Sequence, residues 1–124
     1  MRPYIVQFAT RRMVVPIDRA VIVVDTDGVI QLWNEAAAAL LHIKGADAVG
    51  KPVDIIIPEF LREQHWAAFR SAMANGALRE SRDSLVTPAQ VGGEIRPLLA
   101  SLSLVKDGAG EVVGAIGVLQ SQTA

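Results

Sequence analysis

Apolar runs separated by turn signals predict β-strands near both ends of the chain. The β-branched run Val21–Val24 is continuous, as in a strand that is covered on both sides or packed at an interface. Thr26-Asp27-Gly28 is a tight-turn signal and residues 29–33 return as a second strand, so this segment predicts a β-hairpin. Further strands are predicted at residues 83–87, 94–105 and 111–120, with turns at Gly92-Gly93 and residues 106–110.

The middle of the chain has the composition and the caps of helices. Asn34 is a preferred N-cap residue in front of the helix formers of residues 35–41. Gly45 and Gly50 punctuate a second short helical piece, and a long helix runs from Pro58 to the C-cap pair Asn75-Gly76. Because neighbouring strands are joined by hairpins, this order predicts an α+β domain, an antiparallel sheet with its helices on one face.

The long helix carries a histidine among apolar residues. At 3.6 residues per turn, one stripe of this helix contains Leu61, His65, Ala68, Phe69 and Ala72. An imidazole in such surroundings is either a packed, hydrogen-bonded core residue or a ligand for something held in the core. The choice decides between a cofactor-based sensor and a plain binding module.

Residues 1–15 precede this domain as a separate segment. Pro3 suits the first turn of a helix, but apolar residues cover more than one face of residues 4–15. A short flanking helix and an extended arm are therefore both open. Pro16 separates this leader from the body, and we expect the globular domain to occupy residues 16–124.

Composition excludes several classes of function. The chain has 124 residues, 51% of them hydrophobic, and a net charge of −1, which is typical of one folded domain. Its interspersed charges give no reason to expect nucleic acid or a membrane as a partner, and its apolar runs are too short to span a bilayer. With no cysteine, disulfides and thiolate sites are excluded, and we expect a soluble cytoplasmic domain. No Ser-His-Asp spacing, His-x-x-x-His pair or phosphate-binding glycine loop indicates an enzyme.

Several short motifs occur in the order and spacing of PAS sensor domains. They are the hairpin of residues 21–30, then Trp33-Asn34-Glu35-Ala36-Ala37, Gly50-Lys51-Pro52-Val53, and the closing hairpin of residues 106–114. Over roughly residues 17–120 the chain therefore resembles the PAS family. The resemblance implies a PAS fold, a five-stranded antiparallel sheet curled round a central pocket that the helices close, and a role in sensing and signal transduction.

Within that family, Ile57-Pro58-Glu59 followed by His65 resembles the haem-binding domains of oxygen-sensing histidine kinases. In those domains the histidine seven residues after the proline ligates the haem iron, and Pro58 plus seven is His65. The resemblance therefore implies a haem b sensor with His65 as the proximal iron ligand. We expect its pocket to be lined by Leu61, Phe69 and Ala72 from the helix, and by residues that share one strand face, Leu98, Ala100, Leu102 and Leu104.

Other positions depart from the oxygen-sensor pattern. Those sensors carry an arginine on the strand after the helix, where this chain has Ser84 or Leu85, so oxygen is not specified as the signal. Light-sensing members of the family need a cysteine for their flavin or chromophore, and this chain has none. The sequence contains no kinase, cyclase or DNA-binding segment, so we expect a gas or redox signal to pass to a partner in trans unless this chain is an excised fragment. The cations nearest in sequence for haem propionates are Arg70, Arg79 and Arg82.

Two alternatives to haem stay open. The first is a cofactor-free interaction module, which forms a homodimer through its outer sheet face and through leader residues Ile5, Phe8, Met13 and Val14. The second is a sensor of a small apolar or organic-acid metabolite in the same pocket. In the simplest case His65 only hydrogen-bonds a carbonyl or carboxylate beside a small closed pocket.

Overall fold

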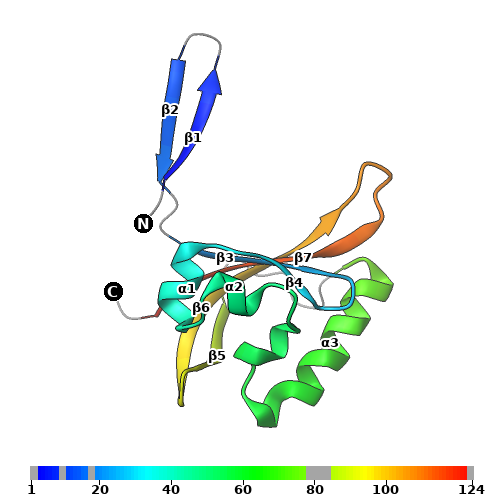
Figure 1. Cartoon of the computed structure of the whole chain (residues 1–124). Coiled ribbons are helices and arrows are strands. Elements are labelled where there is room, and N and C mark those ends of the chain that lie inside the picture. The colour runs from blue at the N-terminus through cyan, green and yellow to red at the C-terminus, as the bar shows by residue number, and fades with distance from the viewer. Residues whose placement is uncertain (1–2, 9–10, 17–18, 78–84, 123–124) are drawn as a thin grey trace.

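A five-stranded antiparallel sheet forms the body of the protein (Figure 1). The computed structural model describes residues 3–8, 11–16, 19–77 and 85–122, with side chains from residue 19 onward. The strand order across the sheet is β4-β3-β7-β6-β5, and every pairing is antiparallel. This confirms the predicted α+β architecture. The strands are β3 (Ala20–Asp25), β4 (Ile30–Trp33), β5 (Leu85–Val91), β6 (Glu94–Lys106) and β7 (Val112–Ser121).

Between β4 and β5, the described residues form five helical segments, which gather on one side of the sheet (Figure 1). The long helix that was predicted from Pro58 begins with a separate 3-10 turn, because Leu61, with φ −107° and ψ −4°, departs from α-helical geometry. It ends as predicted at Gly76, which takes a left-handed φ of 67° that suits glycine. The segments are α1 (Glu35–Leu41), α2 (Gly45–Ala48), η1 (Val53–Ile56), η2 (Glu59–Leu61) and α3 (Arg62–Asn75).

Asn34 joins the first helix to the sheet. Its side-chain oxygen accepts hydrogen bonds from the Ala37 N–H at 2.8 Å and from the Val21 N–H at 3.0 Å. Its side-chain amide donates to the carbonyl of Arg19 at 2.9 Å. The predicted N-cap is therefore confirmed, and the same residue also fixes the start of β3 against α1.

The turn between β3 and β4 is held by Asp25, whose Oδ1 accepts from the N–H groups of Asp27 and Val29. Gly28 has a φ of 77°, a conformation that costs a side-chain-bearing residue energy. A Cβ on Gly28 would lie 2.3 Å from Cζ3 of Trp66 on α3. Glycine is thus required at position 28 for two reasons, the positive φ of the backbone and the lack of space for a side chain beside the Trp66 ring.

Strand β5 differs from its prediction. The sequence indicated residues 83–87, whereas β5 runs from Leu85 to Val91, and residues 83–84 lie outside the described residues. The sequence pattern stopped before Pro88, since proline cannot donate to a sheet ladder. A proline is tolerated here because β5 is an edge strand, and Pro88 lies opposite Pro97 of β6.

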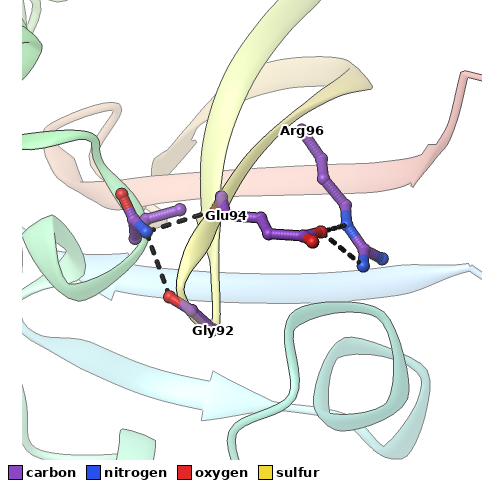
Figure 2. A network of polar contacts seen from close by, with 4 residues as sticks. Gly92, Glu94 and Arg96 are labelled. Atoms are coloured by element: carbon purple, nitrogen blue, oxygen red, sulfur yellow. Dashed lines mark hydrogen bonds and ion pairs between the residues drawn. The ribbon is translucent and has the colours of Figure 1, made fainter.

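The turn joining β5 to β6 confirms the signal of Gly92-Gly93 and is closed by side chains (Figure 2). The Gln90 side-chain amide donates to the carbonyls of Gly92 at 3.0 Å and Glu94 at 3.3 Å. Arg96 forms a 2.8 Å ion pair with Glu94. These contacts are exposed, so they fix the turn but contribute little to global stability.

The leader forms strands, β1 (Pro3–Phe8) and β2 (Arg11–Pro16), and not the helix that was one of its two alternatives. They pair antiparallel, with Pro3 opposite Pro16, and this two-stranded sheet stands apart from the body in Figure 1. The helical alternative was wrong because the two leader segments pair with each other as strands. The hydrophobic periodicity within one segment does not show which other segment it pairs with.

The core lies between the helices and the inner sheet face. Among the described residues, all those whose side chains are buried in it are hydrophobic, and no polar or charged residue is fully buried. Ile30 and Leu41 have no exposed surface at all. This filled region under α1 and α2 contrasts with the space under α3, where the core is incomplete.

Candidate ligand-binding cavity

A cavity of about 230 Å³ lies between α3, η1 and the inner face of the sheet. Most of its lining is aliphatic. From the helical side it is lined by Val53, Ile56, Ile57, His65, Ala68, Phe69, Ala72 and Met73. From the sheet it is lined by Ile22, Val24, Leu85, Thr87, Pro88, Ala89, Ala100, Leu102, Leu104, Ala115, Ile116, Gly117 and Leu119.

Helix α3 presents its predicted stripe to this cavity. His65, Ala68, Phe69 and Ala72 are three and four residues apart, so they lie on one face, and all four line the space. Leu61 does not line it, contrary to the sequence prediction. It belongs to the separate turn η2, whose geometry is out of phase with α3.

Small residues on the sheet create the opposite wall. Leu102 pairs with Gly117 and Leu104 pairs with Ala115, so each long side chain of β6 faces a short one on β7. Ala100, Leu102 and Leu104 line the cavity as predicted. Leu98 points to the same side but is 3% exposed within the filled core, so it does not contact the open space.

Sequence reasoning missed Ile56, Ile57, Thr87, Ala115 and Gly117 as lining residues. The strand positions could have been found by pairing β6 in register with β7 and with β5, because residues opposite each other share a face. The η1 positions had no such signal, since one 3-10 turn has too few residues to show a periodicity.

Only two of the described lining side chains, His65 and Thr87, carry nitrogen or oxygen atoms. The Nδ1 atom of His65 is buried and has no hydrogen-bond partner among the described residues. Within the described part of the chain, Nδ1 of His65 thus lacks the carbonyl or carboxylate partner of a packed core histidine. Burial lowers the pKa of His65 below its usual value of 6.5, and the negative charge of Asp54 opposes that shift. The imidazole is consequently neutral at pH 7.

Aromatic rings hold His65 in place. Its ring lies 5.1 Å from that of Trp66 and 6.3 Å from that of Phe69, measured between centroids, and Trp66 packs edge-on against Phe69 at 5.5 Å. Trp66 in turn rests on Gly28. The part of α3 that lines the cavity thus packs on the β3–β4 turn through Trp66.

Some features of this cavity suit haem and others do not. His65 lines an apolar space, as an axial ligand would. The volume of 230 Å³ is, however, smaller than the roughly 300–1,000 Å³ of most small-molecule sites, and a porphyrin is larger than most such ligands. A metal-ligating histidine usually donates its second N–H to a neighbouring acceptor, and Nδ1 of His65 has none. Haem therefore does not fit this conformation unless α3 moves away from the sheet.

The arginines that were candidates for haem propionates give no support. Arg70 is exposed on α3 and does not line the cavity, while Arg79 and Arg82 lie outside the described residues. Ser84, one of the two positions compared with the oxygen-sensor arginine, also lies outside them. Leu85, the other, lines the cavity with an aliphatic side chain.

A five-stranded antiparallel sheet with helices closing a pocket on one face is the arrangement implied by the sequence resemblance. The family model described as PAS fold matches residues 16–124. The chain belongs to the PAS family. It is thus a PAS domain of the sensory and signalling type, and the family assignment does not extend to haem binding.

Solved PAS domains share this fold at low sequence identity. The PAS domain of a Colwellia psychrerythraea protein is 21% identical, with a TM-score of 0.72 over 86% of this chain and 88% of that one. The PAS domain of the Cronobacter turicensis RpfR quorum-sensing receptor, in complex with C12:0, is 14% identical, with a TM-score of 0.67 over 87% and 97%. The PAS domain of histidine kinase ThkA is 21% identical, with a TM-score of 0.57 over 85% and 100%.

No curated protein sequence matches this chain. Across the described ranges, no helix is long and apolar enough to cross a membrane. The nature of the ligand of this PAS domain is therefore inferred from its own cavity.

Proposed function

We propose that this PAS domain is a non-catalytic sensor that binds a small, mainly apolar molecule in the cavity under α3. The observation that carries the proposal is the cavity itself, an apolar space of 230 Å³ beside an otherwise filled core. Protein interiors are close-packed, and voids larger than a water molecule are few. A space of this size costs stability unless a ligand fills it.

Support also comes from the RpfR PAS domain, which has been solved in complex with C12:0 and in complex with BDSF. It shares the fold of this chain, and it illustrates that a PAS domain binds small molecules. The identity of 14% gives no reason to transfer either ligand.

Signal output in this proposal uses the strands that line the cavity. Residues alternate between the two faces of a strand, so β6 and β7 contact the ligand on one side and solvent on the other. A ligand that separates Leu102 from α3 would change the twist of β6 and hence its outer face. The outer face would then report occupancy to a protein partner in trans.

We further propose that the outer sheet face mediates a homodimer. Its centre contains no charged residue and includes Val21, Val23, Leu99, Ser101, Ser103, Val105, Ile116, Val118 and Gln120. A two-fold symmetric interface packs a patch against its own copy, and a charge-free patch avoids the repulsion of like charges. Val118→Glu should therefore yield monomers in sedimentation velocity, whereas Ala39→Glu on the exposed side of α1 should not.

The ligand proposal is tested by filling the cavity. Ala100 is 2% exposed and lines the space, so Ala100→Leu should occupy it. Native mass spectrometry and thermal shift of the purified protein with a library of small apolar compounds should give binders that this variant loses. Ala67→Leu is the matched control, because Ala67 is exposed on α3 and does not line the cavity. Equal binding by both variants would remove the cavity from consideration.

Haem b with His65 as the iron ligand is the second candidate. The position of an imidazole in the wall of an apolar cavity supports it, but the volume requires α3 to move away from the sheet before haem can enter. Titration of the protein with hemin should then give a saturable Soret band that His65→Ala abolishes. A spectrum that stays that of free hemin would exclude this candidate and leave the first intact.

A further inference from the structure

The volume of the cavity sets the size of the group that can be buried in it, although the cavity is open to solvent beside Leu102, which is 46% exposed. A group the size of a water molecule takes up about 30 Å³, and an apolar cavity of about 150 Å³ holds benzene. The 230 Å³ available here therefore suits a molecule of about eight to ten non-hydrogen atoms.

The described walls of the cavity carry no charged side chain. None of the described lining residues is Lys, Arg, Asp or Glu. Arg62, at the start of α3, donates to the Ile57 carbonyl at 3.0 Å and does not line the cavity. Asp54, on η1, acts electrostatically on His65, so the charge that acts on this lining residue is negative.

An anion in this space would lose its hydration and find no counter-charge among the described lining residues. Transfer of an unpaired ion into an apolar interior is far more costly than transfer of a neutral polar group. A neutral imidazole and the hydroxyl of Thr87 can each hydrogen-bond one polar group of a ligand. The lining thus favours few polar groups and no charge.

We infer that the ligand of this cavity is an uncharged, mainly apolar molecule of about eight to ten non-hydrogen atoms, with one polar group that hydrogen-bonds to His65 or Thr87. This inference rests on the proposed sensor function and narrows it. Carboxylic acids of the same size are excluded, so the organic-acid sensor among the alternatives is disfavoured.

A pair of isosteric probes tests the charge. Heptanamide and heptanoate have the same alkyl chain and about nine non-hydrogen atoms each, a size that fits the volume, but only heptanoate is charged at pH 8. Heptylammonium adds the opposite charge. Calorimetric titration of the full chain at pH 8 should find heptanamide bound roughly tenfold or more tightly than either ion.

The outcomes distinguish failure of the inference from failure of the sensor proposal. Heptanoate or heptylammonium binding as tightly as heptanamide would overturn the inference and leave the sensor proposal standing. Binding of none of the three probes would overturn the sensor proposal for ligands of this size, and the inference with it. Binding of heptanamide without comparable binding of either ion supports both the sensor proposal and the inference of an uncharged ligand.

Variants confirm where the probe binds. Ala100→Leu should abolish heptanamide binding, and Ala67→Leu should leave it unchanged. If Ala100→Leu does not fold, Ala68→Leu narrows the same cavity from α3. His65→Leu together with Thr87→Val should weaken heptanamide binding several-fold while sparing benzene, which needs no hydrogen bond. Equal loss of both probes would assign these residues a merely structural role.

Discussion

The contact between Gly28 and Trp66 makes Gly28→Ala the sharpest test of this structure. Gly28 has a φ of 77°, and forcing alanine into that region costs about 1–2 kcal/mol. The added methyl would also lie 2.3 Å from Cζ3 and 2.4 Å from Cη2 of Trp66, far inside contact distance. Displacing the ring from a packed site adds about 1–3 kcal/mol. We therefore expect Gly28→Ala to destabilise the domain by about 2–5 kcal/mol in total.

Gly50→Ala separates the two contributions. Gly50 has a similar φ of 89°, but a Cβ there would meet no atom within 4 Å. It should cost only the backbone term of about 1–2 kcal/mol. Urea unfolding, followed by circular dichroism and fitted with a common m-value, gives both free energies.

The difference between the two variants is the cost of the Trp66 contact. Equal losses in Gly28→Ala and Gly50→Ala would refute the packing of Trp66 on the β3–β4 turn. A second check is Trp66→Leu, which should reduce the penalty of Gly28→Ala because its shorter side chain leaves room for the methyl group.

Two further predictions concern Asn34 and His65. Asn34→Ala removes the cap of α1 and two further hydrogen bonds, so it should cost about 2–4 kcal/mol in urea unfolding; Asn34→Asp, which keeps the acceptor, should recover most of the loss, and no recovery would contradict the cap. The lowered pKa of His65 means that the unfolded chain binds its proton more readily, so the free energy of unfolding should be constant above pH 7 and fall as the pH drops through 6.5 towards the folded-state pKa. His65→Leu should remove that part of the pH dependence in thermal melts between pH 8 and pH 5, and an unchanged slope would assign it to other groups.

Local signals predicted much of this fold. The Asp25–Gly28 turn, the Asn34 cap and the Asn75-Gly76 end are each decided by residues within a few positions of one another. Features that depend on pairing across the sequence were harder. The leader strands and the extension of β5 past Pro88 follow from which segment lies alongside, and a single strand's pattern does not contain that information.

The candidate site was predictable to a similar extent. The stripe on α3 that includes His65 and Phe69 follows from helical periodicity and lines the cavity. The match in spacing from Pro58 to His65 could not report the volume of the space, because volume depends on residues such as Gly117 and Ala115 opposite the helix. The proposal of a small neutral ligand in place of haem rests on the volume more than on the histidine.

The opposed prolines of β5 and β6 have a consequence for how this β-rich chain stays separate from its neighbours. Neither Pro88 nor Pro97 has an N–H, so the two cannot exchange hydrogen bonds, and an intact ladder requires the ring nitrogen of Pro88 to point at the open edge. A strand from another molecule that paired with this edge would lack one backbone hydrogen-bond donor, at Pro88. Such an interruption discourages edge-to-edge stacking and the growth of intermolecular sheets. Pro88, which kept the full length of β5 from being predicted, therefore also protects the sheet against aggregation.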